Sequence, residues 1–104
     1  MYSKEKAAEL AGRAKRIGLY SDGNHLIARV DFDEEKVMGF CESVFLATQY
    51  QTNRRALDKA GKGKEQVSLT KRGDKWVSDV SNMVLTSSAE CEIHSALTKI
   101  LMQN

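Results

Sequence analysis

The sequence predicts an α+β fold in which a three-stranded sheet, including a β-hairpin, is covered by helices in the order α-β-α-β-β-α. Three segments repeat apolar residues at three- and four-residue spacing, which is typical of helices that pack through one face. Three shorter segments alternate apolar and polar residues or follow a turn, which is typical of strands. With 104 residues, of which 41% are hydrophobic, the chain can bury one core, so we expect a single globular domain over residues 1–104.

The first helix should begin after Ser3, whose hydroxyl can accept a hydrogen bond from the free N–H groups of the first turn. Its apolar residues form a narrow stripe that reaches Ile17, and Gly18 can take the left-handed conformation that ends a helix. The turn-forming segment 21–24 follows. Residues 25–32 then alternate apolar and polar side chains, which predicts a half-buried strand.

A second helix is predicted from Asp33 as its N-cap, with Glu34 and Glu35 in the first turn, where the helix dipole favours negative charge. A wide arc of this helix is covered by apolar residues, namely Val37, Phe40, Cys41, Val44, Phe45 and Ala47. Three more fall on its opposite flank, namely Leu46, Tyr50 and Leu57. A helix that is apolar on two sides lies between two layers. We therefore expect the sheet on one side and another helix or a second copy of the chain on the other, with these three residues as the interface.

Residues 66–70 and 76–80 predict a β-hairpin whose turn is the segment 71–74. A continuation of its second strand through residues 81–86 is also predicted. Ser87 followed by Glu90 forms a capping box, and the apolar stripe behind it predicts a final helix that reaches the C-terminus.

Composition narrows the class of protein. No apolar run approaches the roughly 18 residues of a membrane span, and the first residues lack the apolar stretch of a secretory signal. The two cysteines, Cys41 and Cys91, suit reduced intracellular thiols better than a disulfide-stabilised scaffold. We therefore expect a cytoplasmic protein.

Basic side chains concentrate in residues 53–75, although the net charge of the whole chain is only +2. The block consists of Arg54, Arg55, Lys59, Lys62, Lys64, Lys71, Arg72 and Lys75. If the hairpin folds back beside the end of the second helix, these residues form one basic face that fits a polyanion such as nucleic acid. Tyr50 and Trp76 flank the block and could stack on bases, or could pack in the core instead. A solvated surface is the alternative interpretation of the charge.

The spacing Cys91-x-x-His94 is the arrangement that most resembles a reactive site. On one helix face these side chains, with Glu90 nearby, could supply two metal ligands or pair a nucleophile with a base. A zinc site needs two further ligands, and His25 is the only other imidazole. An exposed cysteine and a surface histidine are the simpler interpretation, and Cys41 should be a buried, inert thiol.

Two further segments have simpler structural interpretations than chemical ones. Asp31 and residues 33–35 carry four carboxylates that could gather a cation, but helix capping accounts for the last three. Residues 61–64 alternate glycine and lysine but lack the spacing and the Ser or Thr of a phosphate-binding loop. We therefore expect no catalytic residues, no metal and no cofactor.

These observations favour a small non-catalytic protein that binds another macromolecule, as an inhibitor, regulator or adaptor acting through a protein–protein surface. A homodimer is one form of that binding. The alternative is a nucleic-acid-binding protein that uses the basic block 54–75.

Overall fold

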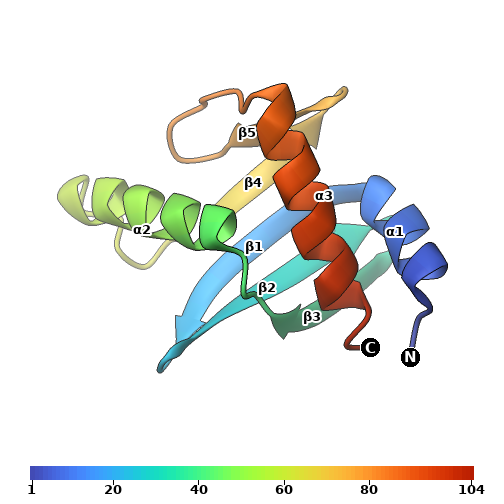
Figure 1. Cartoon of the computed structure of the whole chain (residues 1–104). Helices are drawn as coiled ribbons and strands as arrows, with labels where there is room; N and C mark the ends of the chain where they lie inside the picture. The colour runs from blue at the N-terminus through green and yellow to red at the C-terminus, as the bar shows by residue number, and fades with distance from the viewer.

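Five strands and three helices follow one another in the order α-β-β-β-α-β-β-α in the computed structural model, which describes residues 1–104 (Figure 1). In chain order they are α1 (Lys4–Gly12), β1 (Ala14–Asp22), β2 (His25–Phe32), β3 (Glu35–Phe40), α2 (Val44–Lys59), β4 (Val67–Arg72), β5 (Lys75–Ser78) and α3 (Ser87–Leu101). The strands form one antiparallel sheet in the order β3-β2-β1-β4-β5. The α+β class is therefore confirmed, whereas the three-stranded sheet and the order α-β-α-β-β-α are wrong.

The first additional strand, β1, occupies residues whose apolar spacing predicted a helix. α1 begins as expected, since the Ser3 hydroxyl accepts a hydrogen bond from the first turn, but it ends at Gly12. A β-bulge directly after Ala14 then brings Ala14 and Ile17 to the same buried face although they are three residues apart. The bulge thus imitates helical spacing, and Gly18 lies within the strand rather than at a helix end.

The second additional strand, β3, replaces the start of the predicted second helix. Asp33 and Glu34 form the two-residue turn of a hairpin, since Phe32 of β2 lies opposite Glu35 of β3. Asp33 has a left-handed backbone with a φ of 51°, which aspartate tolerates in such turns, so it does not cap a helix. α2 begins later in the chain, with Ser43 as its N-cap.

The pairing of β3 with β2 explains why this strand resembled a helix. Val37 pairs with Val30 on the face that contains the core, whereas Phe40 pairs with Ile27 on the opposite face. A spacing of three residues fits one face of a helix, but in a strand it places the two side chains on opposite faces.

β2, the β4–β5 hairpin and α3 confirm the elements predicted for those segments. The hairpin turn is shorter than predicted, because Arg72 pairs with Lys75 and only residues 73–74 connect the strands. The cap of α3 differs by one residue. The hydroxyl of Thr86, not that of Ser87, accepts a hydrogen bond from the Ala89 N–H.

The chain beyond β5 turns back instead of continuing the strand. β5 ends at Ser78, and residues 79–86 form a loop. Val84 in this loop pairs with Val77, so the loop runs along the outer edge of β5. The predicted continuation of the strand through residues 81–86 is therefore wrong.

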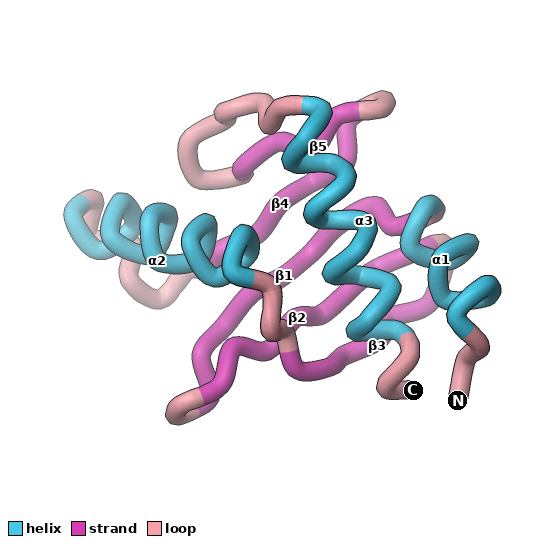
Figure 2. The backbone as a smooth tube through the Cα atoms, in the orientation of Figure 1, coloured by secondary structure: helices cyan, strands magenta, loops and turns pink.

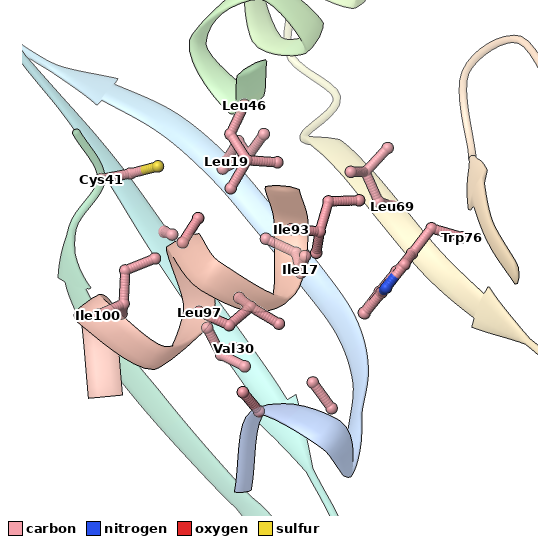
Figure 3. Close-up of a cluster of buried hydrophobic side chains, with 14 of the residues drawn as sticks. Ile17, Leu19, Val30, Cys41, Leu46, Leu69, Trp76, Ile93, Leu97 and Ile100 are labelled. Carbon is pink, nitrogen blue, oxygen red and sulfur yellow. The ribbon is translucent and has the colours of Figure 1, made fainter. Parts of the chain in front are cut away.

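All three helices lie on one face of the sheet, which leaves the other face without a helix (Figures 1 and 2). A cluster of 22 buried residues forms the core between the two layers. Ile93 and Leu97 of α3 are fully buried and lie beside Ile17 of β1 and Val30 of β2 (Figure 3). None of the helices combines the length and the apolar character that crossing a membrane requires.

α2 packs on the core through the flank that the sequence assigned to a partner. Leu46 and Leu57 are only 0% and 4% exposed and belong to the core, and the partly buried Tyr50 packs against it. On the same flank the buried Asn53 accepts a hydrogen bond from the Ser78 hydroxyl at 3.1 Å. Leu46, Tyr50 and Leu57 are thus covered by the chain itself, and no second layer is needed to cover them.

Gly39 of β3 should not tolerate a side chain, because the end of α3 lies directly over it. A Cβ atom at this position would lie 2.7 Å from Gln103 Oε1 and 3.0 Å from Ile100 Cγ2. Gly39→Ala should therefore lower the free energy of unfolding by about 1–3 kcal/mol, the usual cost of overpacking. Urea unfolding followed by circular dichroism measures this change. Gly12→Ala is the matched control, since nothing lies within 4 Å of a Cβ there. Equal stability of Gly39→Ala and the unchanged protein would show that the end of α3 does not pack closely on β3 at this position.

Candidate functional site

Three exposed apolar residues lie near one another in the chain, where β3 ends and α2 begins. Met38 and Phe40 of β3 are 47% and 53% exposed, and Val44 at the first position of α2 is 81% exposed. We call these three residues the β3–α2 corner. The other large apolar residues that are exposed are Met1, Met83 and Val84. Contiguous exposed apolar surface is typical of interaction sites, whereas single exposed residues are common on any protein.

A groove of about 340 Å³ adjoins the β3–α2 corner, between the start of α2 and one side of α3. Phe40 and Val44 both belong to its lining, although the Phe40 side chain projects from the face of the sheet opposite the helices. Ala96 and Ile100 of α3 are buried and add apolar surface to its lining. The remaining lining residues are Glu42, Ser43, Phe45, Glu92, Ser95, Lys99 and Gln103.

The rim of the groove is acidic. Glu42 and Glu92 are exposed and form no ion pair within the chain, and Lys99 is the one basic residue of the lining. Two unpaired carboxylates beside one ammonium group give the lining of the groove a negative balance of charge.

Two side-chain amides that follow α3 cover the outer edge of β3, and Figure 1 shows this end of α3 beside the strand. The Phe40 N–H donates to Gln103 Oε1 at 2.9 Å, and Gln103 Nε2 donates to the Phe40 carbonyl at 2.8 Å. Asn104 Nδ2 donates to the carbonyl of Met38 at 3.2 Å. We call Gln103 and Asn104 the amide clamp. The Asn104 carbonyl accepts the Tyr2 N–H at 2.7 Å, which ties the clamp to the N-terminal segment.

The structure divides the basic block into two groups. One group lies at the end of α2 and in the loop before β4 and contains Arg54, Arg55, Lys59, Lys62 and Lys64. The other lies at the far end of β4 and contains Lys71, Arg72 and Lys75. The six residues of β4 separate the groups by roughly 20 Å along the strand. The hairpin therefore does not fold back beside α2, and the two groups do not form one basic face.

Several of these basic side chains bind groups of the chain itself. Arg54 Nη1 donates to the carbonyl of Glu65 at 3.0 Å, which closes the loop that follows α2. Lys75 Nζ lies 3.9 Å from a carboxylate oxygen of Glu90 in the first turn of α3. These two basic residues therefore help to hold the fold together.

The two aromatic residues that flank the block are not equally accessible. The Trp76 ring is buried, and Lys71 Nζ lies 5.3 Å from its centroid in a cation–π contact. Tyr50 is partly buried against the core. The Trp76 ring is therefore not open for stacking on a base.

Cys91, His94 and Glu90 do not converge on one reactive cluster. His94 Nε2 donates to the Ala8 carbonyl at 3.0 Å, so the imidazole joins α3 to α1. Glu90 forms its ion pair with Lys75, and the Cys91 thiol is exposed. The histidine and the carboxylate thus have partners other than the thiol.

The second thiol lies directly after β3. Burial raises the pKa of Cys41, and a hydrogen bond from the backbone of Ser43 offsets this only in part. The remaining imidazole, His25, packs against Phe40 with 5.2 Å between the ring centroids. No group of three or more histidine, cysteine or acidic side chains is arranged to hold a metal ion.

The carboxylates of residues 31–35 lie along the β2–β3 hairpin. Asp31 Oδ1 is 3.2 Å from Arg29 Nε, and Asp33 forms an ion pair with Arg13. The hydrogen bond from Arg13 lowers the pKa of Asp33 below its usual value. These two carboxylates therefore have basic partners within the chain.

A polar network on the uncovered face of the sheet has no counterpart in the sequence predictions. Ser68 Oγ and Thr70 Oγ1 donate to the Asp79 carboxylate at 2.7 and 2.8 Å, and Arg16 Nη2 donates to Ser68 Oγ at 3.0 Å. The network joins β1, β4 and the loop after β5. Its only trace in the sequence is the alternation of polar residues along β4.

Arg54 and Arg55 are adjacent in the sequence but differ in their contacts, which makes them a matched pair. Arg54→Ala removes the hydrogen bond to the Glu65 carbonyl, so backbone amides of residues 61–66 should exchange faster with solvent. Arg55 is exposed and has no ion pair, so Arg55→Ala should leave this exchange unchanged. Hydrogen exchange followed by mass spectrometry measures both variants. The same exchange rate in both would mean that Arg54 does not stabilise the loop.

The two thiols should react at very different rates. Because burial raises the pKa of Cys41, little of its reactive thiolate exists near neutral pH, whereas the Cys91 thiol is exposed. A thiol reagent such as Ellman's reagent should modify one thiol rapidly, and Cys91→Ser should abolish the rapid phase. Cys41→Ser should retain it. A rapid phase that persists in Cys91→Ser would contradict this assignment.

Comparison of the chain with models of protein families, with curated proteins and with solved structures found no match.

Proposed function

We propose that this chain is a small non-catalytic protein that binds another protein through the β3–α2 corner and the adjoining groove. The observation that supports this most directly is the exposure of Met38, Phe40 and Val44 beside a groove with apolar lining. Burial of a large apolar side chain contributes about 1.5–3 kcal/mol, so a partner that covered this corner would gain several kcal/mol. An inhibitor, a regulator and an adaptor are the roles consistent with such binding.

The corner is also well ordered before any partner arrives. The backbone of Phe40 is fixed by the pairing of β3 with β2. Val44 opens a helix whose N-terminus is capped by the Ser43 hydroxyl. A surface that is already fixed loses little conformational entropy on binding, which favours its use for recognition.

Nucleic-acid binding is the alternative, and one observation favours it. Arg55, Lys59, Lys62 and Lys64 are exposed at the end of α2 and form no ion pairs. The separation of this group from the hairpin and the burial of the Trp76 ring weaken this alternative. We therefore favour a protein partner, which includes a second copy of the chain.

The proposal predicts that Val44→Glu impairs partner binding without unfolding the protein. Val44 is 81% exposed, and an acidic residue suits the first turn of a helix. Met83→Glu is the matched control, because it adds the same charge at an exposed apolar residue in the loop along β5. Immobilised variants should be compared for capture from extract of the source organism, with and without nuclease, by quantitative mass spectrometry.

We expect the unchanged chain and Met83→Glu to capture the same protein in equal amounts, with or without nuclease. Its recovery should fall about tenfold with Val44→Glu, which corresponds to loss of one buried anchor. Equal recovery with Val44→Glu and Met83→Glu would reject the corner as the binding site. Capture that disappears with nuclease and with Arg55→Ala and Lys59→Ala would support the nucleic-acid alternative instead.

A further inference from the structure

The two edges of the sheet are closed in different ways. At β5 the chain's own backbone completes the edge, since the Ser78 N–H donates to the Met83 carbonyl at 2.9 Å and the Leu85 N–H donates to the Trp76 carbonyl at 2.8 Å. At β3 no backbone segment lies alongside. Only the amide clamp, Gln103 and Asn104, bonds to the outward-facing groups of this strand.

The clamp reproduces the hydrogen bonds of a missing strand. A side-chain amide has the same N–H donor and C=O acceptor as a peptide group. Gln103 both accepts from the Phe40 N–H and donates to the Phe40 carbonyl, as a residue of a neighbouring antiparallel strand would. Asn104 bonds to Met38, which is two residues earlier and therefore faces the same way.

We infer that β3 is a docking strand, and that an extended segment of the protein partner adds alongside it as a sixth strand after displacing the amide clamp. This inference rests on the proposed function, because it identifies the part of the partner that the β3–α2 corner receives. Main-chain hydrogen bonds supply the affinity in such strand addition, and alternate side chains supply the specificity. Displacing the clamp moves two side chains and leaves α3, which ends at Leu101, in place.

The surroundings of β3 define the chemistry of that segment. Met38 and Phe40 project on the same face, so alternate apolar residues of the segment would pack on them. Gln103 lines the groove, and its departure enlarges the space for one further apolar side chain. Glu42 and Glu92 at the rim are unpaired, so a Lys or Arg at the end of the segment near α2 completes the match.

A labelled peptide tests the inference directly. The probe is a fluorescein-labelled peptide of nine residues that alternates Val with Thr and Lys, and its control is the same peptide N-methylated at alternate backbone nitrogens. N-methylation removes the N–H groups that pair with a strand edge but keeps the side chains. Fluorescence anisotropy measures binding to the unchanged chain, to Gln103→Ala with Asn104→Ala, and to Gln103→Glu.

We expect the double variant to bind the unmodified peptide about tenfold more tightly than the unchanged chain, because the peptide no longer has to displace the clamp from the edge of β3. Gln103→Glu keeps the acceptor for the Phe40 N–H but loses the donor to the Phe40 carbonyl, so its affinity should lie between the two. The N-methylated peptide should bind none of them. Thermal unfolding of each variant establishes that it is folded.

Three results would overturn the inference. One is equal binding of the peptide to the double variant and to the unchanged chain, or no binding to either. Another is equal binding of the N-methylated peptide. The third is a double variant that dimerises in analytical ultracentrifugation and ignores the peptide, which would assign the edge to a second copy of the chain. These results are separate from the capture experiment, in which the proposed function fails if Val44→Glu has no effect.

Discussion

The packing of α3 on the covered face of the sheet determines the rest of the molecule. Ile93 and Leu97 fill the centre of this face, and further along the same helix Ile100 lies against Gly39 of β3. Because α3 ends at this point, the residue that follows two positions later, Gln103, reaches the outer edge of β3. α3 also forms one wall of the groove. The groove and the amide clamp therefore both depend on where α3 lies on the sheet.

A sheet with helices on one face leaves its other face uncovered, and the backbone N–H and C=O groups along its two edges need hydrogen-bond partners. On the uncovered face, Arg16, Ser68 and Asp79 bond to one another. The edge at β5 is completed by backbone from the following loop. The edge at β3 carries exposed apolar side chains and is covered by side chains alone. The two edges therefore differ, because β5 is covered by backbone and β3 only by side chains.

Sequence periodicity identified the elements whose apolar pattern has a single interpretation. Residues 25–32 alternate without interruption, and the stripe of α3 repeats over four turns, so both were predicted correctly. The pattern misled where pairing between strands decides the structure. The bulge after Ala14 gives a strand the spacing of a helix, and the turn at Asp33 forms because β3 has β2 to pair with. Both causes lie in the pairing with a neighbouring strand, which the apolar spacing within one segment does not reveal.

The candidate site was less predictable than the fold, because it depends on exposure and not on residue type. The apolar character of Phe40 and Val44 was evident in the sequence, but both were assigned to a helix that packs on a sheet, and their exposure follows from the true position of β3 at an edge. Gln103 belongs to no motif and lies 63 residues from Phe40 in the chain. The same amide at the end of α3 would be an ordinary polar side chain if another strand followed β3 in the sheet. Its significance comes from strand order. Because β3 is the last strand of the sheet, the outer N–H and C=O groups of Phe40 are free to bond to this amide or to a strand from another protein.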